Sequence, residues 1–245
     1  MAQLVEFEKT SCYAMSEDEA RFIYKEIFED ECYDISDLRE APFVIDAGAN
    51  IGLFSLYVKN KFPSAKIIAF EPAPESYDVL RRNLELHNIS DVEALPLGLA
   101  SKAGTEKLTY FPNLPGNSTI KPEEKKQMFE LAAKLNEQAA AMLRFEDSQQ
   151  FDVKLERLSN ILSNRPSFTR IDFLKIDVEG AELDVLRGLD DNHWNLVQNV
   201  VLETWDTSGV RNEIEGLLTS KGFVIKREEA SWAEGFWMIA ASRVN

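Results

Sequence analysis

Short apolar runs alternate with segments of helical spacing along most of the chain. The apolar run Phe43-Val44-Ile45 reads as a buried strand, and apolar positions with helical spacing follow it from Ile51 to Phe62. The same alternation recurs, with further strands predicted at 66–70, 171–176 and 198–203, a strand with its exit loop at 92–99, and further helices at 74–87, 181–188 and 211–221. Strands that alternate with helices predict a parallel sheet covered on both faces, so we expect a doubly wound α/β domain.

Several segments stand outside this alternation. Extra strands are expected at 107–111 and 151–158, and a terminal hairpin at 223–226 and 235–242. Residues 1–42 precede the first core strand, and Ser16 to Glu19 has the pattern of a capping box. It predicts a helix to about Phe28 with Phe22, Ile23 and Ile27 inward, in a leader or lid over the cofactor edge of the sheet.

Residues 122–146 form the longest amphipathic pattern in the chain. Proline stands at its start, and an apolar stripe contains Met128, Leu131, Leu135, Ala139 and Met142. A doubly wound sheet does not require this helix. It is therefore either a helical cap, inserted at about 121–147 in a main domain of residues 43–245, or a plain packing helix.

The turn after the first strand indicates a cofactor site. Gly48 and Gly52 allow a tight turn with bare backbone between a strand and a helix, as in nucleotide-binding α/β folds. A nicotinamide fingerprint needs glycine at the third position of the turn, where this chain has Asn50. Asp46 at the strand end would repel phosphates and would suit a cationic ligand; otherwise it caps the helix.

The second strand ends in Glu71-Pro72, and a carboxylate there is placed to accept hydrogen bonds from ribose hydroxyls. A solvated loop charge is the alternative for Glu71. A ligand with a ribose and a positive centre but no phosphate is S-adenosylmethionine (SAM). In sites of this type the exit of the third strand, here at Gly98, faces the adenine.

Four carboxylates fall at predicted carboxyl ends of strands, namely Asp46, Glu71, Asp177 and Glu203. Because those ends meet at one edge of an open α/β sheet, we expect one shared site. Asp177 is the first choice for a base that removes a proton from an acceptor hydroxyl, with Glu203 second. Lys175 either balances charge and orients the acceptor or is a strand residue paired with Asp172 or Glu179.

A metal is an alternative to the simple base. Asp177 with Glu203 or Glu179 could hold Mg²⁺ or Mn²⁺, which would lower the pKa of an alcohol. No histidine stands nearby in the sequence, and we favour the metal-free base. His87 and His193 are both expected on the surface.

Charge and cysteine content limit the class of partner. The 245 residues carry a formal net charge of −15, which argues against nucleic acid as a partner. Cys12 and Cys32 have no metal or CxxC spacing, and the chain has neither a signal peptide nor an apolar run of membrane length. We therefore expect a soluble, cytoplasmic protein with no membrane partner; the oligomeric state is not predicted.

Three blocks of sequence resemble the FkbM-type SAM-dependent methyltransferases. These blocks are 44–52 (VIDAGANIG), 69–72 (AFEP) and 174–182 (LKIDVEGAE), and Tyr24–Phe28 is similar to the leader of that family. The resemblance implies a class I methyltransferase fold, with a seven-stranded sheet whose last strand is antiparallel. It also implies O-methylation, often of sugars, lipids or polyketide and nonribosomal peptide products, sometimes by a domain of a megasynthase. One departure is that Thr204-Trp205 follows Glu203, where the family commonly has histidine two residues after the glutamate.

The leading hypothesis is an O-methyltransferase that acts on a hydroxyl or carboxyl group. Its acceptor would be a small or carrier-tethered polyketide or nonribosomal peptide intermediate, bound near Asp177, Glu203 and Lys175. The cofactor would be held by Asp46, Gly48, Asn50, Gly52, Glu71, Pro72 and Gly98. The alternatives are a methyltransferase of a sugar or glycolipid, a SAM-binding scaffold without catalysis and, disfavoured by Asn50, a nicotinamide oxidoreductase.

Overall fold

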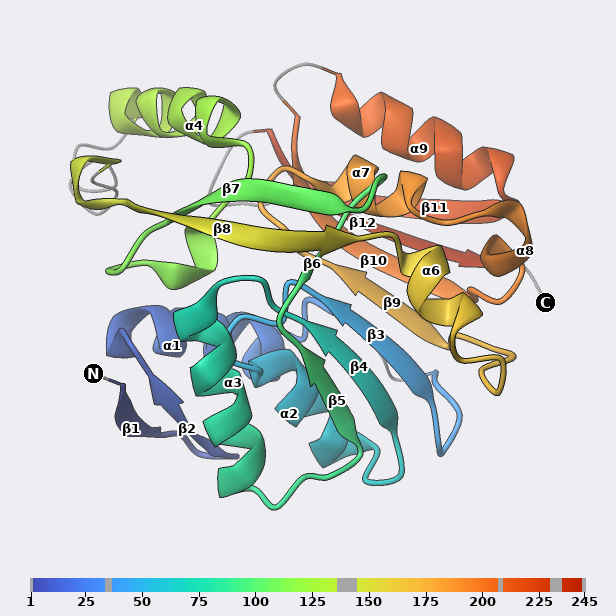
Figure 1. Ribbon diagram of the computed structural model, residues 1–245, viewed down its shortest axis with the longest axis horizontal. Coiled ribbons are helices and arrows are strands. Elements are labelled where there is room, and N and C mark those ends of the chain that lie inside the picture. The colour runs from blue at the N-terminus through green and yellow to red at the C-terminus, as the bar shows by residue number, and fades with distance from the viewer. Residues whose placement is uncertain (1, 34–36, 136–144, 207–208, 230–234, 244–245) are drawn as a thin grey trace.

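The computed structural model describes residues 2–33, 37–135, 145–206, 209–229 and 235–243, without the side chains of 131–135. Its centre is a seven-stranded sheet of order β11-β12-β10-β9-β3-β4-β5 (Figure 1). The strands are β3 (Phe43–Ala47), β4 (Lys66–Phe70), β5 (Val92–Leu95), β9 (Phe173–Ile176), β10 (Asn199–Trp205), β11 (Phe223–Glu229) and β12 (Phe236–Arg243). The last strand, β12, is antiparallel to both β10 and β11, whereas β3 is parallel to β4 and β9. The doubly wound fold, its antiparallel last strand and the terminal hairpin are therefore confirmed.

Helices cover both faces of this sheet (Figure 1). On one face lie α2 (Leu53–Lys61) and α3 (Pro74–Leu86); on the other lie α6 (Leu158–Ser163), α7 (Glu182–Arg187), α8 (Asp191–Trp194) and α9 (Val210–Ser220). Strand β3 shows why both faces are apolar. Val44 belongs to the core beside α2 and α3, whereas Ile45 and Ala47 belong to the core beside α7 and α9. Since both faces are covered, the strand reads as a continuous apolar run rather than an alternating one.

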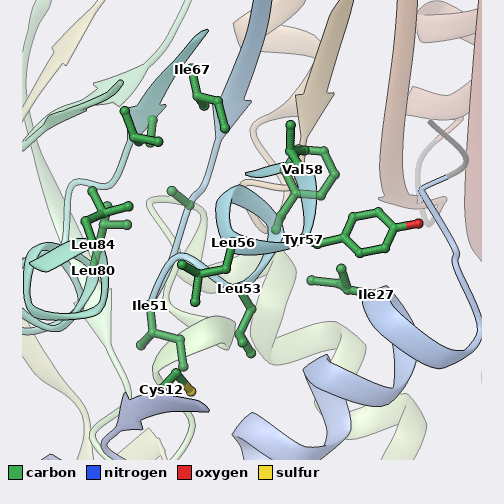
Figure 2. Close-up of a cluster of buried hydrophobic side chains, with 14 of the residues drawn as sticks. Cys12, Ile27, Ile51, Leu53, Leu56, Tyr57, Val58, Ile67, Leu80 and Leu84 are labelled. Atoms are coloured by element: carbon green, nitrogen blue, oxygen red, sulfur yellow. The ribbon is translucent and has the colours of Figure 1, made fainter. Parts of the chain in front are cut away.

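The N-terminal segment is built into the first of these cores. It contains a hairpin of β1 (Gln3–Glu6) and β2 (Ser11–Ala14), then α1 (Glu17–Tyr24) and the π-helical turn η1 (Lys25–Glu29). Figure 2 shows Cys12 and Ile27 among the side chains of α2 and α3. The hairpin was not predicted, because its strands are only four residues each, too short to show a clear alternating pattern.

The predicted helix of this segment is confirmed, but its inward face is partly wrong. Phe22 is 53% exposed, whereas Ala20, Tyr24 and Phe28 are buried. The Ser16 hydroxyl accepts a hydrogen bond from the Glu19 amide as expected of a capping box. The Glu19 carboxylate instead accepts a hydrogen bond from the backbone of Gly116, so only half of the box forms.

A second, three-stranded sheet of order β6-β8-β7 stands between β5 and β9 in the chain. Its strands are β6 (Gly98–Leu99), β7 (Gly104–Tyr110) and β8 (Gln149–Glu156). The predicted strand of 92–99 is confirmed at 92–95. In the predicted exit loop the chain leaves the large sheet after Leu95, and Gly98 then pairs with β8. Pro96, which has no amide hydrogen, stands at that break.

The connection between β7 and β8 contains the short turns η2 (Pro115–Asn117) and η3 (Phe145–Asp147) and the helix α4 (Pro122–Leu135). Figure 1 shows α4 above β7, beyond the edge of the doubly wound core. The predicted helix is confirmed to Leu135, and the stripe positions Ala139 and Met142 lie outside the described residues. None of the helices in the described part of the chain is long and apolar enough to cross a membrane.

Candidate active site

A cavity of about 990 Å³ opens at the carboxyl ends of β3, β4, β9 and β10. Its volume is at the upper end of the range of about 300–1,000 Å³ that is usual for ligand sites. Glu71, Asp177 and Glu203 line it together, as the strand order predicts. The walls above the strand ends come from the N-terminal segment, the loop 113–118 and α4. The cavity is thus large enough for a cofactor and an acceptor side by side.

The turn after β3 lies against the neighbouring strand β4. The amides of Gly48 and Ala49 both donate to the carbonyl oxygen of Phe70, at 3.0 and 2.9 Å. Asn50 has φ +47°, a left-handed conformation, and its side-chain Oδ1 is buried without a hydrogen-bond partner among the described residues. A buried acceptor beside a cavity is costly unless a ligand donates to it. Asn50 is therefore suited to contact a ligand.

Gly48 is required by the approach of a second strand end. A Cβ atom at this position would lie 1.7 Å from the carbonyl oxygen of Asp177, and φ is +79°. We expect Gly48→Ala to lower the free energy of unfolding by at least about 2 kcal/mol, since the backbone of both turns must move. Denaturant unfolding measures this, with Gly104→Ala as the control because a Cβ there has open space. Equal stability of the two variants would contradict the close approach.

Glu71 is held in one orientation by two backbone amides. Its Oε2 accepts from the Asn50 amide and its Oε1 from the Ala73 amide, both at 2.8 Å. Burial raises the pKa of this carboxyl to about 7, and the two amides oppose that shift. Each carboxylate oxygen keeps a lone pair, so the group can still accept hydrogen bonds from a ligand in the cavity.

Lys175 joins the ends of β3 and β9. It is 3% exposed, and its Nζ donates to the carbonyl oxygen of Gly48 at 2.6 Å. The same Nζ lies 3.3 Å from Asp46 Oδ1 and 3.4 Å from Asp177 Oδ2. The interpretation that Lys175 balances charge in the site fits this geometry, whereas pairing with Asp172 or Glu179 does not occur. The nearby carboxylates keep the pKa of Lys175 above its usual value, although burial opposes them.

Several further carboxylates face the same cavity. Glu19, Glu26 and Glu203 line it, and burial raises the pKa of Glu19 and of Glu26 to about 7. Burial and then the charge of Asp177 raise the pKa of Glu203 well above its usual range. Glu26 and Glu203 have no side-chain hydrogen bond or ion pair among the described residues, so both remain available to a ligand.

Helix α4 and the residues just before it contact the turn that follows Asp177. Lys125 is 4% exposed and forms an ion pair with Glu179, while the Thr119 hydroxyl donates to the Glu179 carbonyl oxygen at 2.7 Å. Glu179 itself has φ +57°. Beyond this anchor, apolar side chains from α4, β10, β12 and the loop line the cavity, namely Leu114, Met128, Phe129, Trp205 and Phe236. The outer part of the cavity is thus an apolar compartment.

The structure places the predicted site residues in two groups. Those that line the cavity are Gly48, Asn50, Glu71, Pro72, Gly98, Lys175, Asp177 and Glu203. Asp46 and Gly52 do not line it: Asp46 is fully buried and accepts from the Ser55 hydroxyl at 2.9 Å, and Gly52 packs against Leu80. Strand β10 continues to Trp205, so Glu203 lies within the strand rather than at its end. Alternation then points Glu203 and Trp205 to the same side.

The prediction of two surface histidines was wrong for His193. This ring is 8% exposed, and its Nδ1 lies 2.8 Å from the Ser159 hydroxyl. His87 is half-buried and contacts the carbonyl oxygen of Ser11. Neither lines the cavity. Within the described ranges, no group of three or more His, Cys, Asp or Glu side chains has the geometry of a metal site.

Sequence reasoning missed four residues of the site, namely Glu19, Glu26, Tyr33 and Lys125. Glu19, Glu26 and Tyr33 come from the segment before the first core strand. The Tyr33 hydroxyl donates to Asp177 Oδ2 at 3.3 Å, across 144 positions of sequence. No local pattern in the sequence indicates such a contact.

The comparisons with known proteins agree with this geometry. The sequence model of the family described as methyltransferase FkbM domain matches residues 46–225 of this chain. The match runs from the strand before the glycine turn to the terminal hairpin. This chain belongs to the FkbM methyltransferase family. The nicotinamide oxidoreductase hypothesis is therefore excluded, and the resemblance inferred from the sequence blocks is confirmed.

Relatives within this family are found in fungi and bacteria. The methyltransferase sdnD of Sordaria araneosa is 56% identical over 250 residues, covering 98% of this chain and 96% of that protein. Methyltransferase 1 of Beauveria bassiana is 46% identical over 88% of this chain and 85% of that protein. The 31-O-demethyl-FK506 methyltransferase FkbM of Streptomyces tacrolimicus is 32% identical over 86% of this chain and 84% of that protein.

A solved structure shows the same fold at low sequence identity. The methyltransferase FkbM of Methylobacillus flagellatus superposes with a TM-score of 0.57 and 12% identity, over 85% of this chain and 46% of that one. The sheet order and the antiparallel last strand are those of the class I SAM-dependent methyltransferases. The fold and the family of this chain are thus established as those of a methyltransferase.

Proposed function

We propose that this FkbM-family protein transfers a methyl group from SAM to a hydroxyl oxygen of a small or carrier-tethered polyketide or nonribosomal peptide intermediate. The observation that carries the proposal is Asp177 at the junction of the cofactor turn and the apolar compartment. Family membership supports methyl transfer, and one relative is named as a methyltransferase of 31-O-demethyl-FK506. The name of that relative describes its own substrate and serves here as support for an oxygen acceptor.

The residues of the turn fit SAM. Glu71 is preorganised to accept hydrogen bonds from ribose hydroxyls, and the unpartnered Oδ1 of Asn50 can accept from a donor of the cofactor. Gly48, Pro72 and Gly98 also line this part of the cavity and present little side chain to a ligand. The carboxylates around the site favour a ligand with a positive charge.

Asp177 is assigned the role of general base. Bound SAM supplies an electrophilic methyl group on a sulfonium, so that an O–C bond forms as the S–C bond breaks and a neutral thioether leaves. Asp177 takes the proton of the acceptor hydroxyl as its oxygen attacks. Lys175 places a positive charge between Asp46 and Asp177 and so offsets the repulsion between the two carboxylates. Most of the acceleration comes from holding the acceptor oxygen in line with the methyl group.

A hydroxyl acceptor is favoured over a carboxylate by the charges around the cavity. Lys125 and Lys175 are the cationic side chains that line it in the described part of the chain, and both are already paired with carboxylates. A carboxylate acceptor would enter a part of the cavity where burial and neighbouring carboxylates already disfavour negative charge, as the raised pKa values of Glu26 and Glu203 show. An uncharged acceptor with an apolar body matches both the charges and the aromatic wall.

The proposed function is tested by mass spectrometry after incubation with SAM. The panel contains hydroxylated polyketides and peptides, free and bound to a carrier protein, glycosides with the same aglycones, and carboxylic acids that match the alcohols. We expect a mass gain of one methyl group on alcohols. Methylation confined to the sugar of glycosides would favour the glycoside alternative, and SAM binding without turnover of any acceptor would favour a scaffold.

Glu71→Ala tests the cofactor assignment. We expect SAM affinity to fall by about 1.5–3 kcal/mol, because two hydrogen bonds from ribose to a charged group are lost. Isothermal titration calorimetry measures the change. Glu75→Ala is the matched control, since Glu75 stands four positions along the chain and does not line the cavity. An unchanged dissociation constant for Glu71→Ala would remove Glu71 from the cofactor site.

A further inference from the structure

Tyr33 approaches Asp177 from the N-terminal segment. Its side chain is 4% exposed, and its ring packs edge-on against Phe54 with 5.2 Å between ring centroids. The Tyr33 hydroxyl donates to Asp177 Oδ2 at 3.3 Å, and Lys175 Nζ lies 3.4 Å from the same oxygen. Lys175 Nζ also lies 5.7 Å from the centre of the Tyr33 ring. Two donors thus converge on Oδ2 of one carboxylate.

The other oxygen of Asp177 is left open. Oδ1 accepts no hydrogen bond from the residues that the structure describes, and the side chain is 33% exposed where it lines the cavity. A carboxylate whose one oxygen is held by two donors from different segments has little freedom to rotate. Its free oxygen is then presented to the cavity in one direction.

We propose that Tyr33 is a positioning residue, which with Lys175 holds Oδ2 so that Oδ1 of Asp177 receives the acceptor's proton. This inference rests on the proposed function, because it needs Asp177 to be the base. Tyr33 does not touch the acceptor in this scheme and acts through Asp177. It also gives the N-terminal segment a part in the chemistry, in addition to its place in the core.

The donor role of Tyr33 agrees with its surroundings. Burial, and after it the charge of Asp177, raises the pKa of the Tyr33 phenol well above its usual range, so the hydroxyl keeps its proton. The charged groups that bear on Asp177 come from every neighbouring element: Glu26 of η1, Lys175 of β9, Glu179 of the following turn, Glu182 of α7 and Glu203 of β10. Tyr33 and Lys175 are the groups among these neighbours that donate to Asp177 Oδ2.

In the transfer step Oδ1 gains the proton that the acceptor oxygen loses. The acceptor oxygen forms its bond to the methyl carbon with that electron pair, and the electrons of the S–C bond remain on sulfur. Atoms and charge balance: a sulfonium and a carboxylate become a thioether and a carboxylic acid. Because both donors are on Oδ2, Oδ1 is the oxygen that is open to receive the proton.

The test is a pH titration of the Asp177 carboxyl group. Protein labelled with carbon-13 at aspartate carboxyl groups is titrated by NMR, and the Asp177 signal is assigned by its loss in Asp177→Asn. Because a donated hydrogen bond stabilises the ionised form, we expect Tyr33→Phe to raise the Asp177 pKa by about 0.5–1 unit. Fluorotyrosine at position 33, a stronger donor, should move it in the opposite direction, which a folding defect would not do.

Tyr24→Phe is the matched control. Tyr24 is also 4% exposed, lies in the same N-terminal segment and uses its hydroxyl in a hydrogen bond from the Lys9 amide at 3.2 Å, but it does not line the cavity. We expect this variant to leave the Asp177 pKa unchanged. With an acceptor from the panel, Tyr33→Phe should lower kcat about tenfold with KM for SAM unchanged, and move the acidic limb of the kcat profile to higher pH.

Each result bears on one claim. An Asp177 pKa equal in wild type and Tyr33→Phe overturns the positioning role of Tyr33. Near-normal kcat in Asp177→Asn overturns the assignment of Asp177 as the base. This kinetic result does not depend on the NMR titration. If Asp177→Asn loses activity while Tyr33→Phe keeps full kcat and an unshifted profile, only the inference about Tyr33 fails.

Discussion

Asp177→Asn is expected to lower kcat by about 10²–10⁴-fold while KM for SAM changes less than about threefold. Asparagine keeps the size of the side chain but cannot accept a proton from the acceptor hydroxyl. The effect therefore belongs to the chemical step rather than to cofactor binding. Steady-state kinetics with varied SAM and a saturating acceptor from the panel separates the two parameters.

Asp184→Asn is the matched control for this variant. Asp184 has a side chain 30% exposed, close to the 33% of Asp177, and its carboxylate pairs with Lys121 at 3.0 Å. It does not line the cavity, so its kcat should stay near that of the wild type. A normal kcat for Asp177→Asn would show that another group serves as the base.

The same assay separates a simple base from a metal-assisted reaction. Full activity after dialysis against EDTA agrees with proton transfer to Asp177 alone. Loss of activity that Mg²⁺ or Mn²⁺ restores would instead make Asp177, with Glu203 or Glu179, a ligand set for a divalent cation. Either result leaves the loss in Asp177→Asn in place, because both mechanisms need this carboxylate.

Replacement of residues 126–144 by a flexible glycine-serine linker is expected to abolish turnover and to change SAM affinity by less than about 0.5 kcal/mol. The replaced segment contributes Met128 and Phe129 to the apolar wall, while the cofactor turn at Gly48 to Glu71 is untouched. Loss of that wall exposes the acceptor compartment to water and removes contacts with the acceptor. Calorimetry with SAM and turnover of the best acceptor measure the two effects.

The linker begins after Lys125 for a structural reason. Lys125 pairs with the half-buried Glu179 in the turn after Asp177, and removal of the lysine would leave that carboxylate without its cation. Lys125→Met is therefore a useful companion variant. It removes the ion pair with Glu179 in the turn after Asp177 but keeps the apolar wall of Met128 and Phe129. Equal loss of SAM affinity and turnover in the linker variant would indicate that α4 is a packing helix, the alternative left open by its sequence.

The sequence alone determined the doubly wound sheet and the cofactor turn. Apolar runs such as Phe43–Ile45 are buried on both faces of the sheet. A run without polar positions predicts this burial directly, because a strand with one face in water would alternate. The glycines of the turn, and the carboxylates that follow β4 and β9, are local features, since their positions relative to a strand end need no knowledge of the rest of the fold. Consequently Glu71 and Asp177 could be assigned to one cavity before the structure was known.

Only the tertiary structure decided which groups share contacts across the chain. Asp46 is next to the turn in sequence, yet the packing of β3 between β4 and β9 turns its carboxylate to Ser55 and Lys175 rather than to the cavity. Tyr33 and Lys125 reach the Asp177 turn from segments 144 and 52 positions away from Asp177, by way of η1 and α4. Such contacts depend on how whole elements pack against one another, and the spacing of residues in one segment holds no information about the other. The strand ends were therefore predictable, whereas the individual contacts that the covering segments make with them were not.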